Sequence, residues 1–167
     1  DNLTARGISN AVTINGLLDP IERATAIEQV ADGTADLLYI APEMLRSRTI
    51  ERLLLNRNVV RFVIDEAHCF SVWGQDFRTD YLYIGDFIRK LQEKKLQPKP
   101  IAVSCFTATA KQKVVSDICD YFKQKLDINL KIFAANSERK NLHYSVLHAE
   151  TADKKYFLLR DLILGHN

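Results

Sequence analysis

The chain has 167 residues, of which 47% are hydrophobic and 26% are charged, and this composition is typical of one globular domain. A formal net charge of +2 excludes a uniformly basic surface, so any nucleic-acid contact must come from local patches. The three cysteines have no C-x-x-C spacing, which argues against a disulfide framework and indicates a reducing compartment, so we expect a cytoplasmic protein.

The sequence predicts no membrane-spanning helix, and its N-terminus resembles the interior of a longer chain. No apolar run approaches the roughly eighteen residues that a membrane-spanning helix needs, so we expect no membrane partner. The N-terminus carries neither a signal peptide nor an initiator methionine, and residues 1–7 resemble the end of a helix closed by glycine. We therefore expect a piece of a longer protein.

Segments with strand and helix patterns alternate along the chain. Residues 11–14 predict a short strand, and a helix follows Asp19, which is placed to cap it, with Pro20 at the first helical position. Gly33 ends that helix after about residue 31. Further strands are predicted over residues 36–40, 59–64, 101–106, 130–133 and 142–147, and further helices over about 43–55, 81–95, 110–125 and 153–164.

The strand–helix–strand repeats predict an α/β fold with a mostly parallel sheet and helices on both faces. Residues 59–64 are almost uniformly apolar, which indicates burial on both faces of that sheet. In such folds ligands bind beyond the carboxyl ends of the strands. Two segments with reactive side chains leave predicted strands there, residues 65–68 and residues 104–109.

Two adjacent carboxylates, Asp65 and Glu66, directly follow the strand predicted over residues 59–64. Asp65 is suited to hold Mg²⁺, directly or through water, and Glu66 is suited to orient a water molecule near a γ-phosphate. The alternative is that the pair only ends a strand in solvent. The apolar strand before the pair and the Ala-His after it favour the metal site.

The phosphate-binding half of such a site is absent from these residues. No stretch reads Gly-x-x-x-x-Gly-Lys-Ser/Thr, and none of the six glycines precedes a lysine. That loop would supply backbone N–H groups and a lysine charge to hold phosphates. The sequence therefore predicts the metal and water half of a nucleotide-hydrolysing site without the half that holds the phosphates.

Two small hydroxyl side chains, Thr107 and Thr109, end the second segment. Thr109 is also placed to cap the helix predicted from about residue 110, and we expect one of the threonines to do so. Since both segments leave the sheet at one edge, we expect these threonines to lie near His68.

Aromatic and basic side chains crowd the loop predicted over residues 65–78. Trp73, Phe77, Arg78 and Tyr81 suit stacking on single-stranded bases and binding of phosphates. The alternative is an aromatic cluster that anchors a long loop onto the domain, and spacing alone does not separate the two. Asp76 fits an internal ion pair or a turn better than a ligand.

The histidines do not predict a zinc site. His143 and His148 are five residues apart, and His68 adjoins Cys69, so neither pair has the spacing of zinc ligands.

Together these motifs resemble a known family. The Asp-Glu-Ala-His box at residues 65–68, followed by Ser-Val-Trp-Gly-Gln-Asp-Phe-Arg at residues 71–78, looks like the RecQ branch of superfamily 2 helicases. That branch has Ser-x-Trp-Gly-His-Asp-Phe-Arg at this place. Residues 39–43, 106–110 and 139–142 resemble other RecQ motifs in the same order, over nearly the whole chain.

The resemblance implies a three-layer α/β/α RecA-like fold of the P-loop NTPase type, truncated at its N-terminal side. Residues 1–138 would be the C-terminal portion of the first motor domain, and residues 139–167 would lead into the second. The implied activity is ATP-driven unwinding of DNA with 3′-to-5′ polarity in repair and recombination. The implied partners are single-stranded and partly duplex DNA, in the bacterial nucleoid or the eukaryotic nucleus.

The resemblance also implies roles for individual residues. Asp65 would hold Mg²⁺ in the ATP complex, and Glu66 would polarise the attacking water. His68 and the two threonines would couple hydrolysis to DNA binding. The residues that sense single-stranded DNA would be Trp73, Phe77 and Arg78.

Three departures from the family pattern stand out. Gln75 replaces the usual His, which bears on coupling through the loop, while Phe106 replaces Leu and Lys140 replaces Pro. Without a phosphate loop, we expect the isolated chain to lack ATPase activity. A truncated sheet would expose apolar surface, so we also expect self-association of the truncated domain.

Two other functions fit the same residues. One is a degenerate motor domain that binds DNA or a partner without turnover. The other is a different superfamily 2 ATPase, for example one acting on RNA, although the aromatic loop argues against it.

Overall fold

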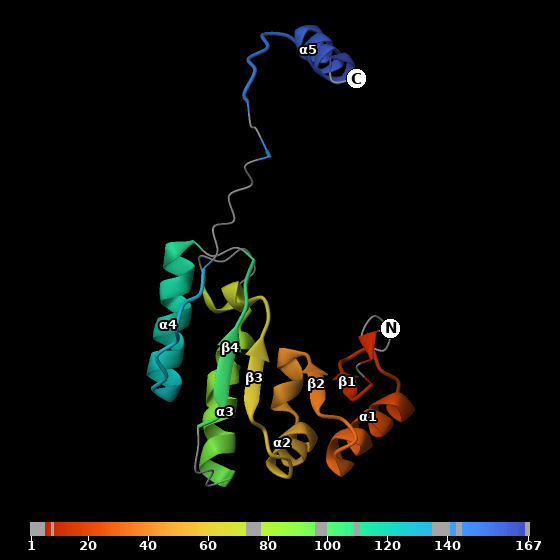
Figure 1. Ribbon diagram of the computed structural model, residues 1–167, viewed down its shortest axis with the longest axis vertical. Helices are drawn as coiled ribbons and strands as arrows, with labels where there is room; N and C mark the ends of the chain where they lie inside the picture. The colour runs from red at the N-terminus through yellow and green to blue at the C-terminus, as the bar shows by residue number, and fades with distance from the viewer. Residues whose placement is uncertain are drawn as a thin grey trace. The chain divides into compact units, whose positions relative to one another are not determined.

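The computed structural model describes residues 6–7, 9–72, 78–95, 100–108, 111–134, 141–142 and 145–165 (Figure 1). The chain divides into two compact units, Asp1–Lys131 and Ile132–Asn167. The domain boundary predicted between residues 138 and 139 lies outside the described residues. Among the described residues, no helix is both long and apolar enough to cross a membrane.

The first unit alternates short strands with helices, as the sequence predicts. Its strands are β1 (Ala11–Ile14), β2 (Leu37–Ile40), β3 (Arg61–Ile64) and β4 (Ala102–Cys105). Its α-helices are α1 (Pro20–Asp32), α2 (Arg48–Leu55), α3 (Tyr81–Lys95) and α4 (Gln112–Leu126), and its 3₁₀ helices are η2 (Pro42–Arg46) and η3 (Ala67–Phe70). The second unit contains α5 (Ala152–Leu164), which has no buried residue.

Local chemistry explains the helix ends that the sequence predicts. The Asp19 side chain accepts hydrogen bonds from the backbone N–H groups of Ile21 and Glu22, both at 2.8 Å. The Glu22 side chain accepts from the Asp19 N–H in return, which completes a capping box. Gly33 ends α1 at φ 90°, a left-handed conformation that glycine adopts without steric cost.

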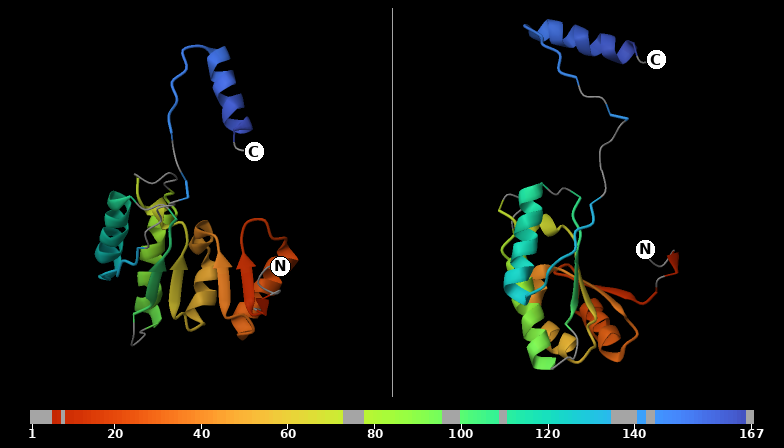
Figure 2. Two further views of the ribbon diagram at one scale, coloured as in Figure 1. Left: turned by 45° about the horizontal axis from the view of Figure 1, so that its top comes forward. Right: turned by 60° about the vertical axis from the view of Figure 1, so that its left-hand side comes forward.

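Both strand pairs found among the described residues are parallel. β1 pairs with β2, with Ala11 opposite Leu37, and β3 pairs with β4, with Arg61 opposite Ala102. Figures 1 and 2 show the four strands in one row in chain order, although the backbone hydrogen bonds of the described residues join them as two pairs. The prediction of an α/β fold with parallel strands is confirmed.

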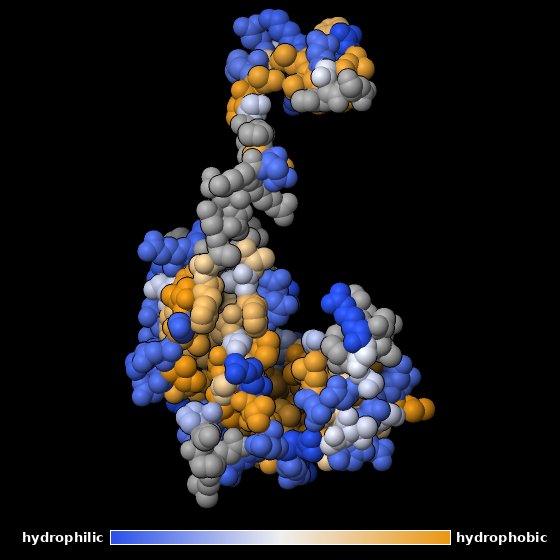
Figure 3. All heavy atoms as spheres, viewed as in Figure 1, coloured by the Kyte–Doolittle hydropathy of each residue, from blue (hydrophilic) through white to orange (hydrophobic). Residues whose placement is uncertain are grey.

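One face of this row of strands is covered by helices. Contacts run from α1 to α2, from α2 to α3 and from α3 to α4, so the four helices form one layer. Side chains on the other face are exposed: Leu37 is 39% exposed, Tyr39 47% and Val63 60%. Figure 3 shows apolar side chains gathered over the strands. The described residues therefore supply two of the three expected layers, and the expectation that residues 59–64 are buried on both faces is wrong here.

Other predicted elements differ from the structure. Residues 130–133 are not in a strand, and neither are the described residues of 142–147, because no described strand pairs with them. The helix predicted over 43–55 is interrupted at Ser47, whose backbone is extended at φ −73° and ψ 128°. It is therefore a short 3₁₀ helix followed by α2.

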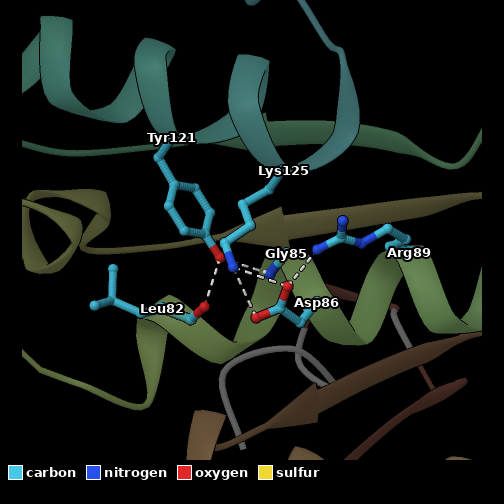
Figure 4. A network of polar contacts seen from close by, with 6 residues as sticks. All are labelled: Leu82, Gly85, Asp86, Arg89, Tyr121 and Lys125. Carbon is cyan, nitrogen blue, oxygen red and sulfur yellow. Dashed lines mark hydrogen bonds and ion pairs between the residues drawn. The ribbon is translucent and has the colours of Figure 1, made fainter.

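A polar network joins α3 to α4 (Figure 4). The Tyr121 hydroxyl donates to the Leu82 carbonyl and accepts from the Gly85 N–H, both at 2.8 Å. Lys125 Nζ lies 2.9 Å from both carboxylate oxygens of Asp86. A Cβ at position 85 would lie 2.6 Å from the Tyr121 hydroxyl oxygen, so this close approach requires glycine.

Replacing that glycine tests the contact between the two helices. We expect Gly85→Ala to displace the Tyr121 hydroxyl and to lower the free energy of unfolding by about 1–3 kcal/mol, as overpacking does. Gly16→Ala is the control, because an added Cβ at position 16 meets nothing within 4 Å. Urea denaturation measures both changes, and equal stability of the two variants would contradict the contact.

Glu51 links α2 to α3 through Lys90 and Lys94, at 2.6 and 2.7 Å. Hydrogen bonds from these lysines lower the pKa of Glu51 to about 2. A pKa lower in the folded than in the unfolded state means stability that is present above the unfolded value and is lost as pH falls. We expect Glu51→Gln to be destabilising near neutral pH, with the difference from wild type shrinking between about pH 4.5 and pH 2. Thermal melts across that pH range measure the difference, and Glu93→Gln, at an exposed position of α3, is the control. A stability difference between Glu51→Gln and wild type that did not change with pH would contradict the expectation.

Candidate active site

The carboxyl ends of β3 and β4 are held together by backbone hydrogen bonds that continue beyond the strands. The Phe106 N–H donates to the Ile64 carbonyl at 2.8 Å, and the Ala67 N–H donates to the Phe106 carbonyl at 2.9 Å. The segments after the two strands therefore meet at one edge, as the sequence predicts. This edge is where parallel α/β folds bind ligands.

Asp65 and Glu66 lie at this edge, and both are exposed. The Glu66 N–H donates to Oδ1 of Asp65 at 2.9 Å. Glu66 has a left-handed backbone, with φ 50° and ψ 42°. For a residue other than glycine that conformation costs on the order of 1 kcal/mol, and strained residues of this kind cluster at active sites. Neither carboxylate is packed into the core, so both are accessible to a metal ion, to water and to phosphate.

These donors fit one kind of metal site. Among the residues that the structure describes, no three His, Cys, Asp or Glu side chains gather as a metal-binding group. A Mg²⁺ ion that enters with a nucleotide needs only one or two carboxylates, because water and phosphate oxygens complete its coordination. Asp65 therefore fits a Mg²⁺–phosphate complex better than a metal bound by protein alone.

His68 lies between Glu66 and the segment after β4. Its Nδ1 atom is 3.1 Å from Oε2 of Glu66 and 3.4 Å from the hydroxyl oxygen of Thr107. Protonated Nδ1 donates to the Glu66 carboxylate, whereas unprotonated Nδ1 accepts from the Thr107 hydroxyl. The predicted neighbourhood of His68 and Thr107 is thus present, and one ring nitrogen serves both partners.

The η3 helix is anchored by a cluster of aromatic side chains, of which the sequence had indicated only Tyr81. Phe70 packs against Tyr81, Tyr121 and Phe122, with ring centroids 5.5, 4.6 and 5.2 Å apart. Tyr81 is 8% exposed. Tyr81 therefore belongs to an anchoring cluster and is not available to stack on bases. Of the two roles left open for the aromatic residues of this loop, the structure thus decides in favour of anchoring for Tyr81 only.

The loop residues expected to bind DNA are only partly described. Arg78 is exposed, and its backbone N–H donates to the Cys69 carbonyl at 3.3 Å, which returns the end of the loop to η3. Trp73, Gln75, Phe77 and Thr109 lie outside the described residues, so their roles stay predictions.

Ser71 connects the end of η3 to α4, a contact that its place in the motif at residues 71–78 does not predict. Its side chain is 1% exposed, and its hydroxyl donates to Oδ2 of Asp117 at 2.5 Å. Lys113 lies 2.7 Å from the other carboxylate oxygen, and the lysine and then the serine lower the pKa of Asp117. The partners are 46 residues apart in the chain, so no local pattern could have found the pair.

Together, parallel strands and an Asp-Glu-Ala-His box at their carboxyl edge define the class of this protein, an α/β domain of RecA type. Residues 1–118 match the family described as DEAD/DEAH box helicase. The chain therefore belongs to the DEAD/DEAH box helicase family.

Its relatives within this family are RecQ-type helicases, which confirms the resemblance. The chain is 34% identical over 154 residues to the probable ATP-dependent DNA helicase RecS of Bacillus subtilis, covering 91% of this chain and 28% of RecS. It is 34% identical over 154 residues to RecQ of the same organism, covering 92% of this chain and 24% of RecQ. The RecQ-like DNA helicase blm-1 of Caenorhabditis elegans is 40% identical over 116 residues, covering 66% of this chain and 11% of that protein. The chain thus spans at most 28% of the length of these relatives.

The buried serine offers a direct test of how the segment after the box is held. We expect Ser71→Ala to lower the free energy of unfolding by about 1–3 kcal/mol, because Asp117 loses a buried hydrogen-bond donor. The control is Ser116→Ala on the exposed side of α4, where the hydroxyl bonds Asp120 at 3.2 Å. Chemical denaturation of both variants measures the effect, and an equally small loss in each would contradict the buried bond.

Proposed function

We propose that this chain is the part of a RecQ-type ATP-dependent DNA helicase that binds Mg²⁺ and activates water for ATP hydrolysis. The observation that carries the proposal is the exposed pair Asp65 and Glu66, joined through His68 to Thr107 at one edge of the strands. The relatives RecS and RecQ of Bacillus subtilis are named as ATP-dependent DNA helicases, probable in the case of RecS, which supports the choice of nucleotide and substrate.

Each residue of the site has a distinct part in the proposed reaction. Asp65 would hold the Mg²⁺ of an ATP complex, and the chemistry that the bound ion would supply is neutralisation of charge on the phosphates. The Glu66 carboxylate accepts a hydrogen bond from the attacking water and orients it in line with the γ-phosphate. When Nδ1 of His68 donates to Glu66, the carboxylate is held in position, and when it accepts from Thr107, that hold is released.

DNA binding is proposed for the loop after η3. Arg78 is exposed beside η3 and carries a cation for a backbone phosphate, and Trp73 and Phe77 supply planes for stacking on single-stranded bases. Both ends of this loop return to η3, which also carries His68. In the full-length helicase, binding of single-stranded DNA by this loop would be coupled to ATP hydrolysis. That helicase would move along DNA from 3′ to 5′ and act in repair and recombination.

The isolated chain is proposed to have no ATPase activity. No Gly-Lys-Ser/Thr sequence is present in its 167 residues, so Asp65 alone would have to retain the nucleotide. The exposed apolar side chains on the open face of the strands, including Tyr39 and Val63, also favour self-association of the isolated chain.

Glu66→Gln in the full-length helicase tests the function. The amide keeps the size of the side chain but lacks the negative charge that polarises the attacking water, so we expect ATP turnover to fall by about 10²-fold or more while binding of single-stranded DNA is retained. Glu28→Gln on the exposed face of α1 should leave turnover unchanged. Turnover in the Glu66 variant comparable to wild type, or robust ATPase activity of the isolated chain, would contradict the proposal.

A further inference from the structure

Tyr81, the first residue of α3, makes a contact that the proposed mechanism does not use. Its hydroxyl donates to the backbone carbonyl of Asp65 at 3.2 Å. Burial raises the pKa of Tyr81 to about 12, so the hydroxyl keeps its proton and remains a donor at physiological pH. Phe70 holds the ring edge to face at 85°.

The bonded carbonyl belongs to the peptide unit that joins the two acidic residues. The oxygen of this peptide accepts from Tyr81, and its N–H, which is that of Glu66, donates to the Asp65 carboxylate at 2.9 Å. The peptide is therefore held at both ends. Its orientation sets the directions in which the side chains of Asp65 and Glu66 leave the backbone.

The next peptide unit is also held. Its N–H, that of Ala67, donates to the Phe106 carbonyl at 2.9 Å. Glu66 thus lies between two fixed peptides, which explains how it keeps a left-handed backbone that is unfavourable for residues with a side chain. Without the Tyr81 bond, the first of these peptides would be held at its N–H end only.

We propose that Tyr81 is a positioning residue for the acidic pair, which fixes the Asp65–Glu66 peptide so that both carboxylates face the nucleotide. This inference rests on the proposed function of Asp65 and Glu66. Tyr81 touches neither nucleotide nor metal in this role. Its own N–H donates to the Arg78 carbonyl at 3.1 Å, so the backbone of the proposed DNA-binding loop and the acidic pair meet at this residue.

Tyr81→Phe removes only the hydroxyl, and Tyr121→Phe is its matched control. Tyr121 lies in the same aromatic cluster, but its hydroxyl bonds the Leu82 carbonyl and the Gly85 N–H. The measurement is amide hydrogen exchange, followed by NMR in the whole 167-residue chain. Exchange rates are corrected for the global stability of each variant, so that they report local opening of the peptides around Glu66. We expect Tyr81→Phe to speed exchange at Glu66 and Ala67 by at least about fivefold, which is the effect expected from the loss of one hydrogen bond.

The control should behave differently at the same positions. Tyr121→Phe should speed exchange at Gly85 and leave Glu66 and Ala67 as in wild type. Unchanged exchange at Glu66 and Ala67 in Tyr81→Phe, or an equal change in both variants, would overturn the inference. If Tyr81→Phe does not fold, the wild-type chain supplies the test: the Tyr81 hydroxyl proton must give a slowly exchanging NMR signal, and a hydroxyl proton that exchanges as fast as one in solvent would overturn the inference.

Kinetics of the full-length helicase supply the second measurement. We expect Tyr81→Phe to lower kcat for ATP by about tenfold to a hundredfold, since small misplacements of catalytic groups have effects of this size, with KM changed about twofold at most. Tyr121→Phe should keep kcat. Faster exchange with an unchanged kcat would overturn the positioning role. An active Glu66→Gln variant would instead overturn the proposed function and leave the exchange result standing.

Discussion

The hydrogen bond from the Ala67 N–H to the Phe106 carbonyl is the contact on which the candidate site depends. Strands β3 and β4 are each four residues long, so their own pairing ends before the reactive residues begin. This bond and the one between Phe106 and Ile64 extend the pairing into both following segments. The acidic pair and Thr107 therefore leave the strands in a fixed relation, although they are about forty residues apart in the sequence.

The anchoring of η3 on α3 and α4 allows Glu66, at the exposed edge of the strands, to keep a strained backbone. Phe70 is packed by three aromatic rings from α3 and α4, and Ser71 is tied to Asp117, so η3 is anchored on two helices. Glu66, directly before η3, keeps a left-handed backbone because the residues around it cannot relax. A site of this kind combines solvent-facing carboxylates with a fixed backbone, which is the arrangement that catalysis by positioning requires.

The fold and the site could be predicted from sequence to different degrees. The α1 boundaries followed from Asp19 and Gly33 because capping is local chemistry, and the exposed acidic pair followed from its place after an apolar strand. The contacts of Ser71 with Asp117 and of Tyr81 with Asp65 could not be predicted, since they join residues 46 and 16 positions apart. The strand predicted over 130–133 failed because apolar alternation does not supply a pairing partner.

The hold on the acidic pair is tested most directly by the scalar coupling across the hydrogen bond between the Ala67 amide nitrogen and the Phe106 carbonyl carbon, measured by NMR on isotopically labelled protein. We expect a measurable coupling there, together with one between the Phe106 nitrogen and the Ile64 carbonyl carbon as an internal reference. A clear reference coupling with none at Ala67, and an Ala67 amide that exchanges as fast as an unprotected one, would show that the acidic pair is not held against the segment after β4.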